Sequence, residues 1–148
     1  MSSHLAQMNV ARLGAPTDAP EVAEFMAALD PINALAEQSP GFVWRLQSDS
    51  GNATDIQTTD DPLFIVNMSV WESLEALREY VYKTAHVEYL RRRREWFEKA
   101  VEMHMALWWL PNGELPSIED GLRRIALIRK HGPTPKAFGF TRPFPSGS

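Results

Sequence analysis

The stretch "LFIVNMSVW", residues 63–71, is the clearest strand in the sequence, and the prediction of the fold starts from it. One alternating set of its residues is entirely apolar, whereas the other set contains polar groups. The apolar set is Phe64, Val66, Met68 and Val70, and the polar positions are Asn67 and Ser69. Because successive side chains of a strand point to opposite faces of a sheet, this stretch predicts one dry face and one partly polar face.

The segments around this strand complete a β-α-β-β-α-β order. Strands are predicted over residues 4–13, 42–48, 63–71 and 101–111. A helix capped by Asp18 and kinked or divided at Pro31 follows the first strand, and helical segments from Ser73 to about Lys99 follow the third. This order predicts an α+β fold, a ferredoxin-like βαββαβ unit with both helices on one face of a four-stranded antiparallel sheet.

The remaining segments are predicted to extend this single domain, which covers residues 1–148. A C-terminal helix is expected after Ser117 and should end at Gly132. Residues 49–62 are polar and unpatterned, which indicates a flexible loop. Residues 133–148 form a Pro/Gly-rich tail in which "AFGF" can add a short edge strand.

The composition restricts the partners and the location of the protein. The net charge of −4 argues against nucleic acid, and the four consecutive arginines of "YKTAHVEYLRRRREWF" (82–97) have acidic partners at helical spacing, which predicts a solvated, ion-paired helix. The sequence contains no cysteine, so no disulfide or thiolate metal site is expected, and the cytoplasm is the expected location. No segment has the apolar length of a membrane helix, so no membrane partner is expected.

The polar sides of the four strands predict one mixed surface. It consists of Gln7, Asn9, Val43, Arg45, Asn67, Ser69, Trp71, His104 and Trp108. Amides and an arginine do not suit a dry core, and two tryptophans do not suit a fully solvated face, so a partly enclosed cavity is expected. If both helices lie on the apolar face, a second chain must cover this surface, which predicts a homodimer. The alternative is that these side chains only satisfy one another in a dimer interface.

Four stretches carry a resemblance to a known family. They are "LAQMNVAR", "SPGFVWRLQ", "NMSVWESLEALREYVYKTAHVEYLRRRREWF" and "ALWWLPNGELPSIEDGLRRIALIRKHGPTPKAF". The chain resembles an uncharacterised bacterial family, a domain of unknown function, within the dimeric α/β barrel superfamily. The resemblance implies that two sheets pair as a dimeric α/β barrel. The superfamily includes antibiotic-biosynthesis-type monooxygenases, which oxidise aromatic polyketides without metal or flavin, haem-degrading monooxygenases, and members that only bind ligands.

The resemblance to the haem-degrading members implies one set of site residues. They use an asparagine on the first strand, an aromatic residue on the helix after the third strand, and a later histidine as iron ligand. Asn9, Tyr80 and His86 occupy similar positions here. The sequence departs from that pattern because Tyr80 replaces a tryptophan and because five residues, fewer than in those enzymes, separate Tyr80 from His86.

Three functions remain open from the sequence. In a cofactor-independent oxygenase, an aromatic or polyketide-like substrate would lie between Trp71 and Trp108, with Ser69 and Tyr80 beside it. The residues expected to act on it are Asn9, Asn67 and Arg45, which would stabilise an enolate or phenolate, and His86 or His104, which would serve as base. Burial and nearby positive charge should then lower the pKa of that histidine. The alternatives are a haem protein with His86 as ligand, and a non-catalytic ligand-binding or structural homodimer. No residues occur at the spacing of a non-haem metal site.

Overall fold

A four-stranded antiparallel sheet with the strand order β2-β3-β1-β4 forms the centre of the fold. The computed structural model describes residues 3–47, 61, 63–84, 86–98 and 104–146. The strands are β1 (Ser3–Arg12), β2 (Phe42–Arg45), β3 (Phe64–Trp71) and β4 (Met105–Pro111). The predicted α+β ferredoxin-like architecture is confirmed.

The helices begin and end close to the predicted positions. They are η1 (Pro20–Val22), α1 (Ala23–Gln38), α2 (Leu74–Lys83), α3 (His86–Arg91), α4 (Arg93–Trp96) and α5 (Ile118–His131). Ser73 and Ser117 cap α2 and α5 as expected, each accepting a hydrogen bond from a backbone N–H of the first turn. Asp18 does not cap α1, because η1 precedes that helix. Pro31 lies inside α1, which continues past it undivided.

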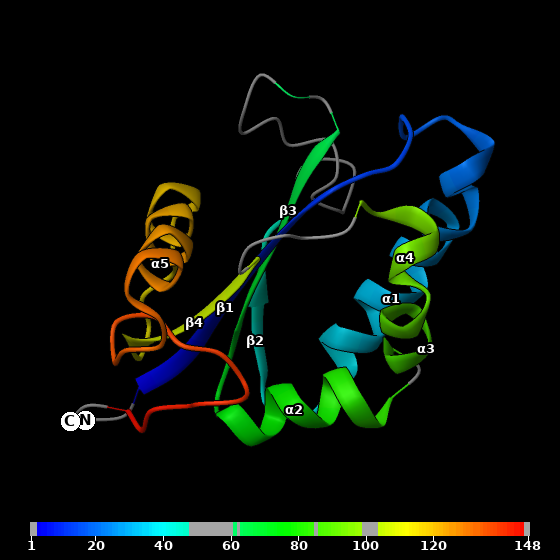
Figure 1. Cartoon of the computed structure of the whole chain (residues 1–148). Helices are drawn as coiled ribbons and strands as arrows, with labels where there is room; N and C mark the ends of the chain where they lie inside the picture. Colours follow the sequence, from blue (N-terminus) through cyan, green and yellow to red (C-terminus); the bar gives the residue numbers. More distant parts are fainter. Residues whose placement is uncertain (1–2, 48–60, 62, 85, 99–103, 147–148) are drawn as a thin grey trace.

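One face of the sheet packs against α5 (Figure 1). Apolar side chains of β1, β3 and β4 form this core cluster with Ile125 and Ile128 of α5. The strand members of the cluster are Ala6, Met8, Val10, Val66, Met68, Val70, Ala106, Trp108 and Leu110. The helix approaches closely at Gly121, where an added Cβ would lie 2.3 Å from Sδ of Met8. A residue without a side chain is therefore required for this contact.

The other face of the sheet lies beneath α1–α4 (Figure 1). Two separate apolar clusters fill this side. One joins Leu5, Trp71 and Leu107 of the sheet to Leu77 and Tyr80 of α2. The other lies at the opposite end, where Leu13, Val22, Ile65 and Trp96 meet. Among the described residues, the buried apolar side chains on this face therefore form two groups, one at each end.

This arrangement reverses the predicted roles of the two faces. The sequence predicted that the apolar set of β3 lies under the first two helices and that the polar set faces a second chain. In the structure α5 covers the apolar set and α1–α4 lie over the polar set. The C-terminal helix was the unassigned element, and its apolar residues supply the cover that the prediction gave to the earlier helices.

The predicted sides of β2 and β4 also need correction. In the register of β1 with β4, Ala6 pairs with Trp108 and Gln7 with Leu107, so Trp108 lies on the apolar face. On β2 a bulge between Phe42 and Trp44 puts Phe42 opposite Trp71, and Val43 packs with the apolar cluster. Alternation alone could not fix these sides, because every residue of β4 before Pro111 is apolar.

The tail after α5 reaches back to the sheet. Phe138 is fully buried and exchanges two backbone hydrogen bonds with Leu107 on β4, so the predicted edge strand of "AFGF" is present as a single β-bridge. Trp109 donates from Nε1 to the carbonyl of Phe144 at 2.9 Å. The predicted loop 49–62 lies outside the described residues, apart from Asp61. Within the described part of the chain, no helix has the length and apolar character to cross a bilayer.

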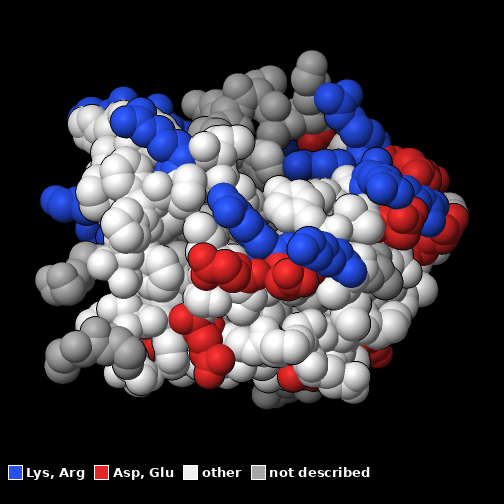
Figure 2. Space-filling model, turned by 90° about the horizontal axis from the view of Figure 1, so that it is seen from below, with Lys and Arg blue, Asp and Glu red and all other residues white. Residues whose placement is uncertain are grey.

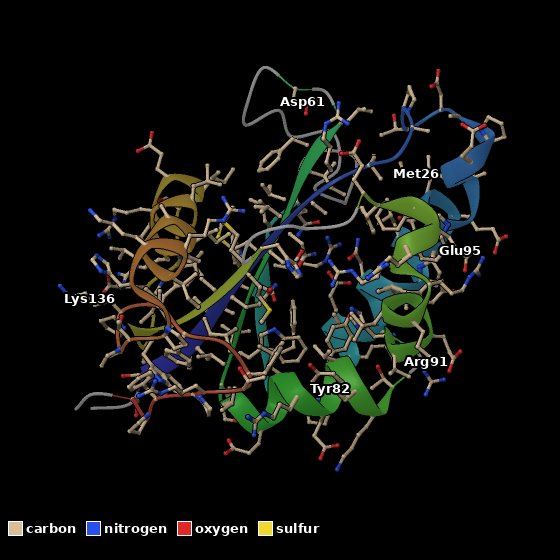
Figure 3. All side chains as sticks on the ribbon, in the orientation of Figure 1. Met26, Asp61, Tyr82, Arg91, Glu95 and Lys136 are labelled. Carbon is tan, nitrogen blue, oxygen red and sulfur yellow. The ribbon has the colours of Figure 1, made fainter. Side chains whose placement is uncertain are left out.

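The arginine run is divided among several partners. Arg91 binds Glu88, and Arg92 binds both Glu95 and Glu24. Arg91 and Glu95 point away from the sheet (Figure 3). The face on the α2 side carries acidic and basic side chains next to one another (Figure 2). These contacts agree with the predicted solvated, ion-paired helix.

Candidate functional site

A strip of polar side chains crosses the face of the sheet beneath α1–α4, between the two apolar clusters of that face. We define the polar strip as Gln7, Asn9, Arg45, Asn67 and Ser69. Gln7 pairs with Ser69 and Asn9 with Asn67 across β1 and β3. Asn67 is exposed, and it lies past the end of β2, whose last residue Arg45 is opposite Ser69. Solvent therefore reaches the sheet at this point, where the core is interrupted.

Gln7 is the centre of the hydrogen bonds within the strip. Its Nε2 group donates to Oδ1 of Asn67 and to Oγ of Ser69, both at 2.8 Å. Its Oε1 accepts from Nδ2 of Asn9 at 3.3 Å. Ser69 also accepts from Nε1 of Trp71 at 2.9 Å. Gln7 and Ser69 are buried, and these bonds offset the cost of removing their polar groups from water.

A row of aromatic rings connects the strip to α2 and α3. Trp71 stacks on Tyr80 with a centroid separation of 5.1 Å, and Tyr80 contacts the ring of His86 at 4.9 Å. The Tyr80 hydroxyl donates to the carbonyl of Ile32 at 3.4 Å. Burial raises the pKa of Tyr80, although the charge of Arg45 acts in the opposite direction. Tyr80 therefore stays neutral near pH 7.

His86 has one nitrogen bonded and one available. Nδ1 lies 3.3 Å from the carbonyl oxygen of Val81, which can only accept, so Nδ1 carries the hydrogen. Nε2 has no hydrogen-bond partner among the described residues. Burial lowers the pKa of His86, and the bond to Val81 only partly opposes this effect. The ring is therefore neutral at pH 7, with an unshared electron pair on Nε2.

Arg45 lies at the β2 side of the strip. It pairs with Ser69 in the sheet, and its side chain is 11% exposed. Nε donates to Glu37 of α1 at 3.1 Å, and Nη2 lies 3.5 Å from Oε1 of Gln47. Nη1 has no partner in the described part of the chain. The arginine thus has a guanidinium donor without a described partner at the β2 side of the strip.

Two predicted site residues lie elsewhere. Trp108 is fully buried on the apolar face, beneath the guanidinium of Arg124. His104 precedes β4 and accepts through Nε2 from Arg93 at 3.0 Å. Burial lowers the pKa of His104, with Arg93 and Arg129 adding to the effect. The other predicted residues lie on the face beneath α1–α4, where Trp71 and Tyr80 connect His86 to the polar strip through successive contacts, and His104 and Trp108 are not part of this row.

The position of Trp71 also differs from a pocket wall. It is fully buried, and it contacts Phe42 and Tyr80. A substrate cannot lie between Trp71 and Trp108, since the sheet separates the two rings. The sequence analysis also did not predict that Gln7 would be the centre of the hydrogen bonds in the strip. The signal was present as a glutamine at an inward position of a strand, but its partners depend on the register of β1 with β3.

A groove also lies on the outer side of Tyr80. Its lining includes Ser39–Gly41 and one side of α2 along its length, and its volume is about 490 Å³. Glu72, Glu75 and Glu79 contribute acidic groups, and Lys83 a basic one. Among the described residues no group of His, Asp or Glu side chains is arranged to hold a metal ion.

The fold and the polar strip can now be compared with known proteins. Residues 4–148 match the family model described as Domain of unknown function (DUF3291). The chain belongs to this family, in agreement with the resemblance noted in the sequence. No curated protein matches the chain at a significant level.

Solved structures share the fold. SnoaB, a cofactor-independent oxygenase from Streptomyces nogalater, matches with a TM-score of 0.50 and 18% identity, covering 78% of this chain and all of its own. Protein SO0527 from Shewanella oneidensis matches with a TM-score of 0.54 and 13% identity, covering 74% of this chain and 93% of its own. These similarities support the ferredoxin-like fold and show the fold alone.

Proposed function

We propose that this protein binds a small aromatic or polyketide-like molecule over the polar strip and oxidises it with molecular oxygen, without a cofactor. The observation that carries the proposal is the interrupted core. Helices cover both ends of this face with apolar contacts, yet the exposed Asn67 lies between them beside an arginine and two further amides. Hydrogen-bonding groups kept at such a position suit a ligand with both apolar and polar parts.

The residues of the strip have distinct roles in this proposal. His86 is neutral and has Nε2 available, so it is the candidate base that removes a proton from the substrate. Asn9, Asn67 and Arg45 stabilise the resulting enolate or phenolate. Oxygen then converts a substrate CH2 group to C=O with release of one water molecule. The fold shared with SnoaB supports this reaction class, and the residues of this chain supply the roles.

Anthrone oxidation tests the proposal directly. Purified protein is mixed with dithranol in air and a chelator, and formation of the quinone is followed by absorbance. Turnover above the uncatalysed rate is expected, with a fall of about 10²–10⁴-fold when His86→Gln removes the base. The matched control is His131→Gln on the exposed end of α5. Binding of dithranol without turnover would favour a non-catalytic ligand-binding protein.

Haem binding is the second candidate, and one observation favours it. The Val81 carbonyl holds the hydrogen of His86 on Nδ1, which leaves Nε2 in the state that coordinates iron. The ring of Tyr80 lies against one side of His86, so a haem would have to approach the Nε2 edge. Titration with hemin should give a Soret band that His86→Ala removes. A spectrum identical to free hemin would contradict this candidate.

We also propose that the protein is a homodimer. α5 contacts β4 and β1, and the apolar side chains nearest β2 are only partly buried. They include Val43, Trp44, Leu46 and Phe64. A second copy packed on this half of the face would bury them and would leave the polar strip within each chain. Sedimentation should give a dimer at micromolar concentration, and Trp44→Glu should give a monomer. A monomeric wild-type protein would contradict this pairing.

A further inference from the structure

The Gln7 amide has no N–H left for a ligand. Both hydrogens of Nε2 are used, by Asn67 and Ser69, and one of the two lone pairs of Oε1 is used by Asn9. Gln7 is 5% exposed, so it can act on a ligand only through these three neighbours.

The neighbours of Gln7 are left with mostly donor groups. Asn67 accepts through Oδ1, and its Nδ2 group, on the other side of the amide, has no partner among the described residues. Ser69 accepts from both Gln7 and Trp71, so its two lone pairs are used, and its hydrogen has no acceptor among the described residues. Within the same part of the chain, Asn9 keeps one N–H and its Oδ1. Together with Nη1 of Arg45, the strip presents N–H and O–H donors from four residues, whereas Oδ1 of Asn9 is its one side-chain oxygen without a described partner.

We propose that Gln7 is the positioning residue that gives the strip this donor character, and that the ligand presents an anionic oxygen to Asn67 and Arg45. The anionic oxygen belongs to a carboxylate or to an ionised phenol or enol on an aromatic body. This inference rests on the proposed function, because it concerns the ligand of the same site. Charge-assisted hydrogen bonds from an amide and a guanidinium are stronger than neutral ones and favour such a group.

A glutamate at position 7 would reverse the character of the strip. Its two carboxylate oxygens only accept, so Asn67 would have to turn Nδ2 toward it and present Oδ1 to the ligand. The substitution Asn67→Asp makes a similar change from the exposed side. It keeps an oxygen to accept from Gln7 and replaces the outward Nδ2 by a second oxygen, without altering the buried residues.

Two probes of the same shape test the inference, 2-naphthoate and its neutral amide, 2-naphthamide. Their dissociation constants are measured from the quenching of tryptophan fluorescence. The wild-type protein should bind 2-naphthoate about tenfold more tightly than 2-naphthamide. Gln7→Glu and Asn67→Asp should each abolish this preference, because the binding of 2-naphthoate weakens more than that of 2-naphthamide. If Gln7→Glu does not fold, Gln7→Met removes the same hydrogen bonds without adding charge, and the preference should fall at least threefold.

The matched control is Gln47→Glu. This exposed glutamine lies beside Arg45, so the variant adds the same charge near the strip without touching Gln7 or Asn67. It should retain most of the preference. An equal loss in Gln47→Glu would overturn the positioning role of Gln7, because simple charge repulsion would then explain the result.

The remaining outcomes separate this inference from the proposed function. Equal binding of the two probes by the wild-type protein would overturn the inference and leave aromatic binding standing. Failure of both probes to bind would overturn the proposed function, and the inference with it. A preference for 2-naphthoate that survives both Gln7→Glu and Asn67→Asp would also overturn it.

Discussion

The two faces of the sheet are both covered by helices of the same chain, but they are held by different interactions. Under α5 the contacts are apolar, and the helix approaches closely at Gly121. Under α1–α4 the apolar contacts stop midway, and Gln7 and Ser69 are satisfied by directional hydrogen bonds instead. The stability of the face under α5 depends on close apolar packing, so polar substitutions there should be strongly destabilising. The stability of the face under α1–α4 depends on paired hydrogen bonds, and some of its polar groups stay available to a ligand.

The largest expected effect is the removal of Trp108 from the apolar face. Trp108→Ala should lower the free energy of unfolding by about 3–5 kcal/mol, measured by urea denaturation, because it leaves a large cavity in a fully buried region. Trp108→Phe should cost less than about 1.5 kcal/mol, since the indole Nε1 of Trp108 has no partner to lose. A loss below about 1 kcal/mol in Trp108→Ala would mean that α5 does not pack on this face.

Removal of one hydroxyl should have the next largest effect, on the polar strip. Ser69→Ala leaves two buried donors, Nε2 of Gln7 and Nε1 of Trp71, without the hydroxyl that accepts from them. It should lower the free energy of unfolding by about 2–3 kcal/mol. Ser39→Ala is the control, because Ser39 bonds only to a helix-end carbonyl, and it should lose about 0.5–1 kcal/mol. Equal losses in the two variants would remove the distinction between the faces.

A smaller effect is expected where α5 meets Met8. Gly121→Ala gains about 1 kcal/mol from helix propensity, but the new methyl group overlaps Sδ of Met8, and overpacking costs about 1–3 kcal/mol. The net result should be a loss of about 1 kcal/mol in denaturation experiments. A second substitution, Met8→Val, should recover part of it. Stabilisation by Gly121→Ala alone would show that Met8 can move aside at little cost.

The smallest effect is the dependence of stability on pH through His86. Its pKa is lowered in the folded state, so below about pH 6.5 the unfolded chain binds a proton that the folded chain does not. Stability should therefore fall as the pH drops below about 6.5 and level off below the folded pKa. The slope from one group cannot exceed about 1.4 kcal/mol per pH unit. His86→Gln should reduce this slope, and His104 should account for part of what remains. An unchanged slope would place His86 in water.

The sequence predicted the fold more completely than the site, and particular residues show why. The cap residues Ser73 and Ser117 and the alternation in β3 are local signals, so the elements follow from them directly. The side on which each strand faces α5 or α1–α4 is not local. Trp108 was misplaced because β4 is apolar on both faces, and its side depends on pairing with Ala6. The prediction of the amide network was incomplete because the network requires the register that brings Gln7 opposite Ser69.

The contact between Phe138 and Leu107 has a consequence for how these molecules behave at high concentration. β4 is an edge strand, and edge strands with free N–H and C=O groups can add strands from other molecules and grow into aggregates. The N–H and C=O groups of Leu107 are both hydrogen-bonded to Phe138 of the same chain. They are therefore not available to a strand of another molecule, so the C-terminal segment protects this edge against fibril-like aggregation.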